Sequence, residues 1–598
     1  MCGFIALFSS STPWDKDVLK KASESMINRG PDDDGEWWSD DCFVGMAHRR
    51  LAIIDLNHSA NQPMVSINKR YIIVFNGEIY NYKNLRQELL EAGVELQTQS
   101  DTEVILELFS LYGDNCLKKL RGMFAFVIWD KIDECYFIAR DPYGIKPLYI
   151  AKTNHGFLIA SQVKALLATG VVSRDDCPYG QGGYWLLGSV PEPYTWFRDI
   201  SALTAGNFIR LSKLGLNEKK WHSISDGWRN LKQLNHKANI KSQVKASLHE
   251  SVRAHLVSDV PVGIFLSGGI DSTSLLAIMK DLGVSKTICI TLKYSEFEGS
   301  SDDESIVAVH VAKQYGYNHH IRVVSKSEFE RDLPDILSAM DQPSVDGINT
   351  WYASKCASEL GLKVVLSGVG GDELFQGYRS FKVIPILVKL WRVAAKVPGV
   401  ELSARFLTRR KAQRSKNPRW NLFSTLAKTV NGAWFLQRGV FAPEELEGLM
   451  GKKLTDKFLK DFTPESMILK MSGKLPTDSK LALSQIYSTC YMRNQLLKDS
   501  DWASMSHSVE LRTPLVDLEL LNSLQSLMPK FYMYSNKALL SNAPNTPLDR
   551  LVTKRKKTGF SIPVNKWLKE INPKLCESGV SRGWAREVAN KIYQDANK

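Results

Sequence analysis

The pattern of hydrophobic and polar positions divides the 598-residue chain into regions of different character. Up to Leu211, short runs rich in Val, Ile, Phe and Tyr alternate with turns containing Asn, Asp and Gly, which predicts β-strands. Helical periodicity is clear only in Tyr82–Ala92 and Thr102–Tyr112. We therefore predict an α+β domain with substantial antiparallel sheet. The predicted strands include CGFIALF, YIIVFNGEIY, MFAFVIWD, CYFIARD and GFLIAS.

The rest of the chain follows a different pattern. After Leu211 the polar stretch SKLGLNEKKWHSISDGW predicts an irregular linker. From about Gln243, helices alternate with the buried strands VGIFLS, KTICITL, HHIRVVS and KVVLSG, which indicates a doubly wound parallel sheet. From Val383 onward the pattern is mostly helical. We expect a first domain at 2–211, a linker at 212–240 and a second domain at 241–598.

Composition excludes several protein classes. The chain has 77 basic and 64 acidic residues, a net charge of +13. No aromatic-interleaved module accompanies the basic clusters, so we expect solvated faces and no nucleic-acid partner. Nine cysteines without a CxxC pair favour free thiols, and no apolar run is long enough to span a membrane. With no signal peptide at the start, we expect a cytoplasmic protein. The clusters are Arg405, Arg409, Arg410, Lys411, Arg414, Lys416 and Arg419, and Lys554–Lys557.

Cys2 is the first candidate for chemistry. It directly follows the initiator Met and precedes Gly3, and a small second residue permits removal of Met1. The thiol would then share a residue with a free α-amine, which titrates at about 7.7–8.0 and can act as its base.

The sequence around this cysteine carries a resemblance. The passages RGPDDDG, HRRLAIIDL, FNGEIYN, SDTEV and RDPYGIKPLY follow Cys2 in this order. Together they resemble the glutaminase domain of class II amidotransferases, N-terminal-nucleophile enzymes with stacked antiparallel sheets between helices. The resemblance implies that Cys2 attacks the amide of glutamine. It also implies an oxyanion hole formed by Asn76 and Gly77, with Arg50 binding the substrate carboxylate and Asp101 and Glu78 binding its ammonium.

Two glycine turns form the second candidate site. VGIFLSGGIDSTSLLAIM is a strand, a small-residue turn and a helix, which directs backbone N–H groups toward an anion. It is not a Walker A loop, and SGGxDS resembles the PP-loop of ATP pyrophosphatases. VVLSGVGGDELFQGY repeats this arrangement. The residues implied for ATP are Leu266, Ser267, Gly268, Gly269, Asp271, Ser272, Ile290, Ser367 and Gly368, and those for Mg²⁺ are Asp271 and Asp372.

Further motifs extend the resemblance to asparagine synthetase over nearly the whole chain. These are LLKDSDWASMSHSVELRTPLVD and RKKTGFSIPVNKWL. In the second, Lys557 matches the lysine that stabilises charge on the adenylate. The implied reaction adenylates a carboxylate with ATP, releases pyrophosphate and admits ammonia channelled from glutamine. We expect only small-molecule substrates as partners. For the oligomeric state, a homodimer is one of the alternatives.

The acceptor carboxylate is left open. Asparagine synthetases usually read SGEGxDE where this chain reads SGVGGDE, so Val369 replaces a carboxylate. DQPSVDGINTWYASK is similar to amidotransferases of surface-polysaccharide clusters, which act on hexuronic acids. Aspartate is favoured and a sugar uronate is the alternative.

Three other functions fit less well. A tRNA-modifying enzyme would have no use for the glutaminase motifs. A β-lactam-synthetase-like enzyme would lack Cys2, and a non-catalytic descendant would have lost Cys2, Asp271 or Lys557, all of which are present.

Overall fold

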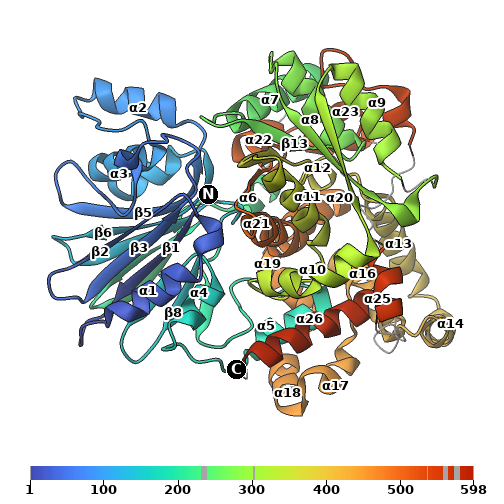
Figure 1. Ribbon diagram of the computed structural model, residues 1–598. Coiled ribbons are helices and arrows are strands. Elements are labelled where there is room, and N and C mark those ends of the chain that lie inside the picture. Colours follow the sequence, from blue (N-terminus) through green and yellow to red (C-terminus); the bar gives the residue numbers. More distant parts are fainter. Residues whose placement is uncertain are drawn as a thin grey trace.

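The computed structural model describes residues 2–229, 239–300, 303–534, 537–555, 563–571 and 580–596. It consists of a β-rich N-terminal part and a larger C-terminal part that lie side by side (Figure 1).

The N-terminal part contains two six-stranded sheets in which every pair of neighbouring strands is antiparallel. The first has the order β10-β8-β9-β1-β3-β2 and the second β12-β11-β7-β6-β5-β4. The strands of the first are β1 (Gly3–Phe8), β2 (Asp33–Trp38), β3 (Val44–Arg50), β8 (Tyr149–Lys152), β9 (Phe157–Ala160) and β10 (Ile200–Ala202). Those of the second are β4 (Met64–Val65), β5 (Tyr71–Ile79), β6 (Gly122–Asp130), β7 (Cys135–Arg140), β11 (Asn207–Ser212) and β12 (Gly215–Lys220).

Side-chain alternation explains how the two sheets stack. Phe4 of β1 and Ile72 of β5 belong to one core between the sheets. Ile5 belongs to the core that also contains residues of α1 (Lys16–Glu24) and α4 (Val163–Ala168). Ile73 packs with α2 (Tyr82–Glu91) and α3 (Asp101–Tyr112). The result is a helix–sheet–sheet–helix stack (Figure 1), which confirms the predicted α+β class.

The polar stretch after Leu211 is a correction to the prediction. Within the segment 212–240 expected to be an irregular linker, β12 pairs with β11 and α6 spans Ile224–Arg229. β12 is an edge strand whose residues are mostly exposed, so it needs no apolar alternation. Residues 230–238 lie outside the described part.

The C-terminal part is built on a five-stranded sheet with the order β15-β14-β13-β16-β17. All four strand pairs are parallel, which confirms the predicted doubly wound sheet. The last strand has no apolar run to predict it, because its ends are a buried glutamate and a buried arginine. The strands are β13 (Val262–Phe265), β14 (Ile288–Tyr294), β15 (Asn318–Val324), β16 (Val364–Leu366) and β17 (Glu510–Arg512).

Helices surround this sheet and make up most of the chain after Val383, as predicted. Those around the sheet include α7 (Ile240–His255), α8 (Ile270–Asp281), α9 (Ser305–Tyr315), α10 (Lys326–Ala339), α11 (Ile348–Glu359) and α12 (Gly371–Leu374). Later helices include α13 (Ser380–Ala394), α14 (Val400–Arg414), α16 (Val430–Arg438), α20 (Ser479–Ile486), α21 (Leu497–Met505), α22 (Leu518–Leu524) and α26 (Val580–Ala596). No helix in the described ranges is both long enough and apolar enough to cross a membrane.

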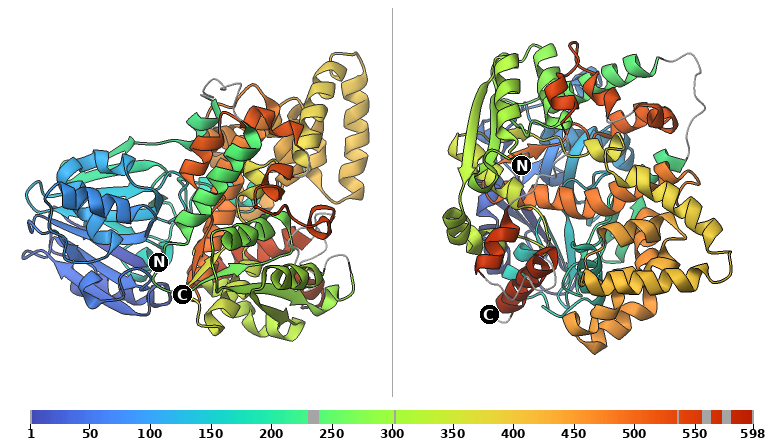
Figure 2. Two further views of the ribbon diagram at one scale, coloured as in Figure 1. Left: turned by 90° about the horizontal axis from the view of Figure 1, so that it is seen from above. Right: turned by 90° about the vertical axis from the view of Figure 1, so that its right-hand side faces the viewer.

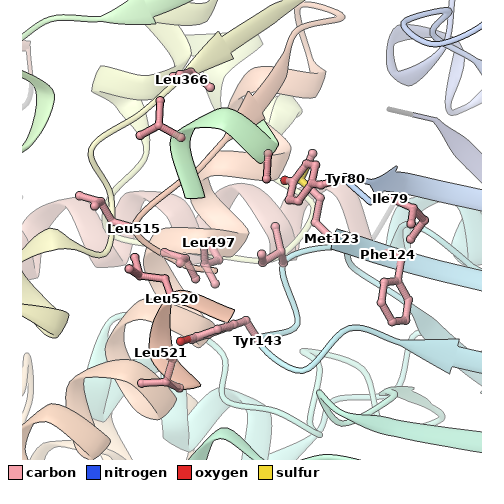
Figure 3. Packing of buried hydrophobic residues seen from close by; sticks show 14 of the residues in the cluster. Ile79, Tyr80, Met123, Phe124, Tyr143, Leu366, Leu497, Leu515, Leu520 and Leu521 are labelled. Atoms are coloured by element: carbon pink, nitrogen blue, oxygen red, sulfur yellow. The ribbon is translucent and has the colours of Figure 1, made fainter. Parts of the chain in front are cut away.

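One apolar core joins the two parts. Figure 3 shows Met123 and Phe124 of the N-terminal part in the same cluster as Leu497, Leu515 and Leu520 of the C-terminal part. Because this interface is buried and apolar, the two parts form a packed unit.

Candidate active site

The N-terminal candidate residues meet in one cavity. It is lined by Cys2, Arg50, Gly77, Glu78 and Asp101, among others. They come from the start of β1, the ends of β3 and β5, and the first turn of α3. The structure therefore brings together the residues that the sequence analysis proposed for glutamine.

Cys2 and Asn76 are in direct contact. The Cys2 backbone nitrogen donates to Asn76 Oδ1 at 3.1 Å. The Asn76 side chain is fully buried, and its Nδ2 has no hydrogen-bond partner in the described part of the chain. Burial raises the pKa of the Cys2 thiol, so a base is needed to generate the thiolate. A buried donor without a partner, on a side chain that binds the Cys2 backbone, is suited to an oxyanion.

Gly77 occupies a position with no room for a side chain. A Cβ atom there would lie 2.1 Å from the Met123 carbonyl oxygen. Because it has no side chain, Gly77 can pair within β5 and also line the cavity with its backbone.

Two buried carboxyl groups lie on the same cavity. Burial raises the pKa of Asp101 to about 6, although its side chain accepts from the Ile79 backbone nitrogen at 3.0 Å. Burial also raises the pKa of Glu78 well above its usual value, against the effect of Arg512. A cationic ligand would favour the charged form of both groups.

Arg50 is already engaged by protein oxygens. Its Nη1 donates to the carbonyl of Asn57 at 2.9 Å and to Asn61 Oδ1 at 2.7 Å, and its Nη2 contacts the carbonyls of Ile54 and Asp55. The guanidinium therefore shapes the loop that follows β3 as well as lining the cavity.

Two buried ion pairs tie this cavity to the C-terminal part. Arg29 donates from Nε to the Cys2 carbonyl at 3.0 Å and binds Asp501 of α21 with both terminal nitrogens, at 2.7 and 3.1 Å. Arg512 of β17 donates to Glu78 Oε2 at 2.9 Å and also binds Glu510. Every one of these side chains is at most 6% exposed, so each charge depends on its partner.

The glycine turns form the second site. β13 and β16 are neighbours in the sheet, and the connections leave them in opposite directions, toward β14 and β17. This is the point in a doubly wound sheet where ligands bind, beyond the carboxyl ends of the strands. A Cβ at Gly368 would lie 2.9 Å from Asp271 Cβ, so the two turns are in contact.

The first turn is held by hydroxyl groups and by a glycine. The Ser267 backbone nitrogen donates to Ser272 Oγ at 3.2 Å, and the Ser267 and Ser272 hydroxyls lie 3.1 Å apart. Gly268 has φ +64°, in the region that favours glycine. Gly269 caps the start of α8.

The two acidic residues of this site share a lysine. Lys537 Nζ lies 2.7 and 2.6 Å from the two carboxylate oxygens of Asp271 and also contacts Asp372. Burial opposes the lysine charge, but Asp271 and Asp372 raise the pKa of Lys537 above its usual value. Within the described ranges, no group of three or more His, Cys, Asp or Glu residues is placed to hold a metal. The two carboxylates nevertheless converge on one cation.

The remaining predicted residues fall into three groups. Leu266 and Ile290 are buried, and their backbones bond to each other at 2.8 Å, so they can offer only backbone to a ligand. The Ser367 backbone nitrogen bonds to the Arg512 carbonyl at 2.8 Å, and half-buried Val369 packs against the main core. Lys557 lies outside the described residues.

The structure adds residues with no role in the sequence analysis. Arg29 stands inside the RGPDDDG motif, and Asp501 and Arg512 stand inside LLKDSDWASMSHSVELRTPLVD, so position in a motif was the available signal. Lys537 stands in none of the motifs.

Known proteins match both parts of the chain. A glutamine amidotransferase domain matches residues 1–222, and an asparagine synthase domain matches residues 243–596. The chain is 30% identical to asparagine synthetase (glutamine-hydrolyzing) 1 of Bacillus subtilis, over 100% of this chain and 91% of that protein. It is 32% identical to a putative asparagine synthetase (glutamine-hydrolyzing) of Mycobacterium tuberculosis, over 95% of this chain and 88% of that protein.

A third relative matches a smaller share of the chain. The chain is 31% identical to the amidase chry2 of Gibberella zeae, over 61% of this chain and 56% of that protein. The two asparagine synthetase matches, in contrast, span both the Cys2 cavity and the glycine turns. The protein is a glutamine-dependent ligase that belongs to the glutamine-hydrolysing asparagine synthetase family.

Proposed function

We propose that this enzyme converts aspartate to asparagine, with ammonia taken from glutamine at Cys2 and aspartate activated by ATP. The glutaminase reaction is assigned to residues 2–211 and the synthetase reaction to 241–598. The observation that carries the proposal is the contact of Cys2 with Asn76 at a cavity that two buried carboxyl groups also line. A full-length asparagine synthetase relative supports joining this cavity to the glycine turns in one reaction.

In the first half-reaction, the Cys2 thiolate attacks the side-chain amide of glutamine and forms a glutamyl thioester. The α-amine of Cys2, freed by removal of Met1, takes the thiol proton and passes it to the departing ammonia. Asn76 Nδ2 and the Gly77 N–H stabilise the oxyanion, and the available Nδ2 supports this assignment. Asp101 and Glu78 hold the substrate ammonium, and Arg50 holds its carboxylate.

In the second half-reaction, the acceptor carboxylate attacks the α-phosphate of ATP. Pyrophosphate leaves, and ammonia displaces AMP from the adenylate. The backbone of the turn at Ser267–Gly269 and the start of α8 would bind the phosphates, which their position beyond β13 supports. Lys557 would stabilise charge on the adenylate.

We assign Mg²⁺ to Asp271 and Asp372. Their carboxylates already accept one shared cationic group, which is the donor chemistry that a hard divalent ion requires. When bound, the metal would neutralise negative charge on the pyrophosphate. Lys537 must then leave at least one of the two carboxylates.

The acceptor is assigned on the family pattern. With Val369 in place of the usual glutamate, the second glycine turn has one carboxylate fewer. The Val369 side chain packs against the apolar core. A hexuronic acid has no ammonium to pair and is therefore the second candidate. Aspartate remains the first candidate acceptor, because the relatives that match nearly the whole protein chain are named asparagine synthetases.

The experiment is a pyrophosphate-release assay with ATP, Mg²⁺ and ammonium. We expect release when aspartate is added and none without an acceptor. Release with a nucleotide-linked hexuronic acid and none with aspartate would replace the first candidate by the second. Val369→Glu gives a matched comparison, since it restores the usual carboxylate: it should leave aspartate-dependent release intact.

A further inference from the structure

Helices α13 and α14 form a basic, apolar and exposed surface that the proposed reaction does not use. We define the α13–α14 hairpin as residues 380–414, which comprise both helices and their connection. Figure 2 shows these helices at the edge of the molecule, away from the N-terminal part.

Helix α13 is apolar on two faces, of which only one is buried. Phe381, Ile384, Val388 and Trp391 face the core. The opposite face carries Val383, Ile386, Leu390 and Val393, followed by Val397 in the connection, and all five are exposed. Their spacing of three and four residues places them on one stripe. A surface helix of a globular protein normally shows one apolar face, so the outer stripe is unexplained by folding.

Helix α14 buries even less. Ala412 is its one buried residue, although the helix has fifteen residues. Leu402, Phe406 and Leu407 are between 57% and 71% exposed. Together, the two helices and their connection hold eight of the large exposed hydrophobic residues of the described chain, which elsewhere are more scattered. A concentration of this kind marks an interaction surface.

The charge of the hairpin decides what kind of partner fits. Residues 380–414 contain nine Lys or Arg and a single acidic residue, Glu401, so they account for most of the chain's net charge of +13. Several of these cations are exposed on α14, and Arg410 lies over the ring of Phe406 at 4.2 Å. Apolar side chains therefore stand directly beside cations on an exposed helix.

We propose that the α13–α14 hairpin docks the enzyme on an anionic lipid membrane surface. A basic helix with exposed Leu and Phe lies in the plane of such a surface, with its apolar side chains below the headgroups and its cations at the phosphates. A second copy of the chain fits worse, because a symmetric interface would place this charge against itself. Nucleic acid fits worse as well, because its backbone offers nothing to the apolar stripe.

The test is sedimentation of the full-length protein with lipid vesicles. We expect binding to vesicles of roughly one part phosphatidylglycerol to two parts phosphatidylcholine, and none to phosphatidylcholine alone. Salt at about 1 M should weaken the binding, because it screens the charges. Absence of binding to the anionic vesicles would overturn the proposal.

Two variants separate the apolar and basic contributions. Ile386→Ser/Leu390→Ser/Val393→Ser removes the stripe, and Arg409→Gln/Arg410→Gln/Lys411→Gln removes charge. Each should lower vesicle binding about tenfold or more. Glutaminase activity should stay unchanged, because all six side chains are exposed on helices that lie away from the N-terminal part (Figure 2).

Matched controls lie on the N-terminal part. Ile132→Ser/Leu214→Ser changes apolar residues that are more exposed than the stripe. Lys219→Gln/Lys220→Gln changes exposed cations, and both variants should bind vesicles like the parent. Equal losses in these controls would show a general effect of charge or apolarity and contradict docking by the hairpin.

Two further measurements identify the rival partners. Light scattering that reveals a dimer, lost on changing the apolar stripe, would assign the surface to a second copy. Binding of duplex DNA or RNA that is lost in the charge variant, with no vesicle binding, would assign it to nucleic acid. Either result would overturn the membrane proposal.

Discussion

The glutaminase cavity and the nucleotide site handle their buried charges in different ways. Around Cys2, two charged groups bind partners from the other part of the molecule, in the Arg29–Asp501 and Glu78–Arg512 pairs. At the glycine turns, Asp271 and Asp372 share the ammonium of Lys537, a group on a flexible side chain. The ion pairs of the first site join the two parts of the molecule, whereas the second site holds a lysine ammonium at the position proposed for Mg²⁺.

The two sites therefore depend on the rest of the molecule in different ways, because their buried charges have different partners. The glutaminase cavity needs the contact between the two parts, because its charges would otherwise be buried without partners. At the nucleotide site, the proposed Mg²⁺ would have to replace the Lys537 ammonium at one carboxylate or both. The predictions below test the two dependences, beginning with the largest expected effect.

Replacement of the nucleophile should separate the two sites completely. Cys2→Ala should lower glutaminase activity at least about 1000-fold, because the thioester can no longer form. Ammonium-dependent pyrophosphate release should persist, since it uses the other site. Cys42→Ala, which changes a free cysteine elsewhere in the same part, is the control and should keep both activities. Glutamine hydrolysis by the Cys2 variant would refute the assignment.

Loss of an ion pair between the two parts should affect folding as well as activity. Arg29→Ala leaves the Asp501 carboxylate buried without its bidentate partner, which costs about 3–5 kcal/mol. Urea unfolding should report this loss, and glutaminase activity should fall because the Cys2 carbonyl loses its donor. Arg198→Ala removes an exposed pair with Asp175 and should change stability by at most about 1 kcal/mol. If Arg29→Ala and Arg198→Ala had equal free energies of unfolding, the ion pair between the two parts would not stabilise the fold as expected.

A neutral substitution at the nucleotide site should leave the glutaminase site working. Asp271→Asn keeps the shape but removes a charge that the cation needs, so pyrophosphate release should fall about 100-fold. Glutaminase activity should survive. Asp335→Asn, on an exposed position of α10, should be neutral in both assays. Products of ADP and phosphate, in place of AMP and pyrophosphate, would be incompatible with this site.

Removal of the internal cation should make the fold depend on an added one. In Lys537→Met, the neighbouring Asp271 and Asp372 carboxylates repel each other, which should destabilise the ion-free protein by about 1–3 kcal/mol. Mg²⁺ should restore the melting temperature of this variant and change the parent less. Lys313→Met, at an exposed position of α9, is the control. A variant that melts like the parent and ignores Mg²⁺ would argue against cation exchange.

The smallest effect concerns pH at the glutaminase cavity. The raised pKa of Asp101, about 6, means that its carboxyl group is charged above this pH and neutral below it. Only the charged form of Asp101 pairs with the ammonium of glutamine. The value of kcat/KM for glutamine should therefore fall as the pH decreases through about 6, and at one pH unit below the pKa it should be roughly tenfold lower. Ammonium-dependent activity, corrected for free ammonia, should lack this step. Asp101→Asn should give a low, flat profile.

Much of the architecture follows from local patterns in the sequence. The apolar, β-rich runs CGFIALF and YIIVFNGEIY predict β1 and β5, and the two apolar faces of these strands require cover on both sides. The apolar runs before the glycine turns place β13 and β16. Strand β12 was not predicted, because it is a mostly exposed edge strand and its sequence therefore carries no apolar pattern.

The sequence by itself also predicted candidate residues for each site, through motifs around Cys2 and Asp271. Only the tertiary structure decided how those sites are held. Arg29 meets Asp501 across 472 positions of sequence, and Glu78 meets Arg512 across 434. Lys537 reaches Asp271 from 266 positions away. Local periodicity reports which face of an element is buried, but the partner of a buried charge depends on how distant elements pack, and no local pattern records that packing.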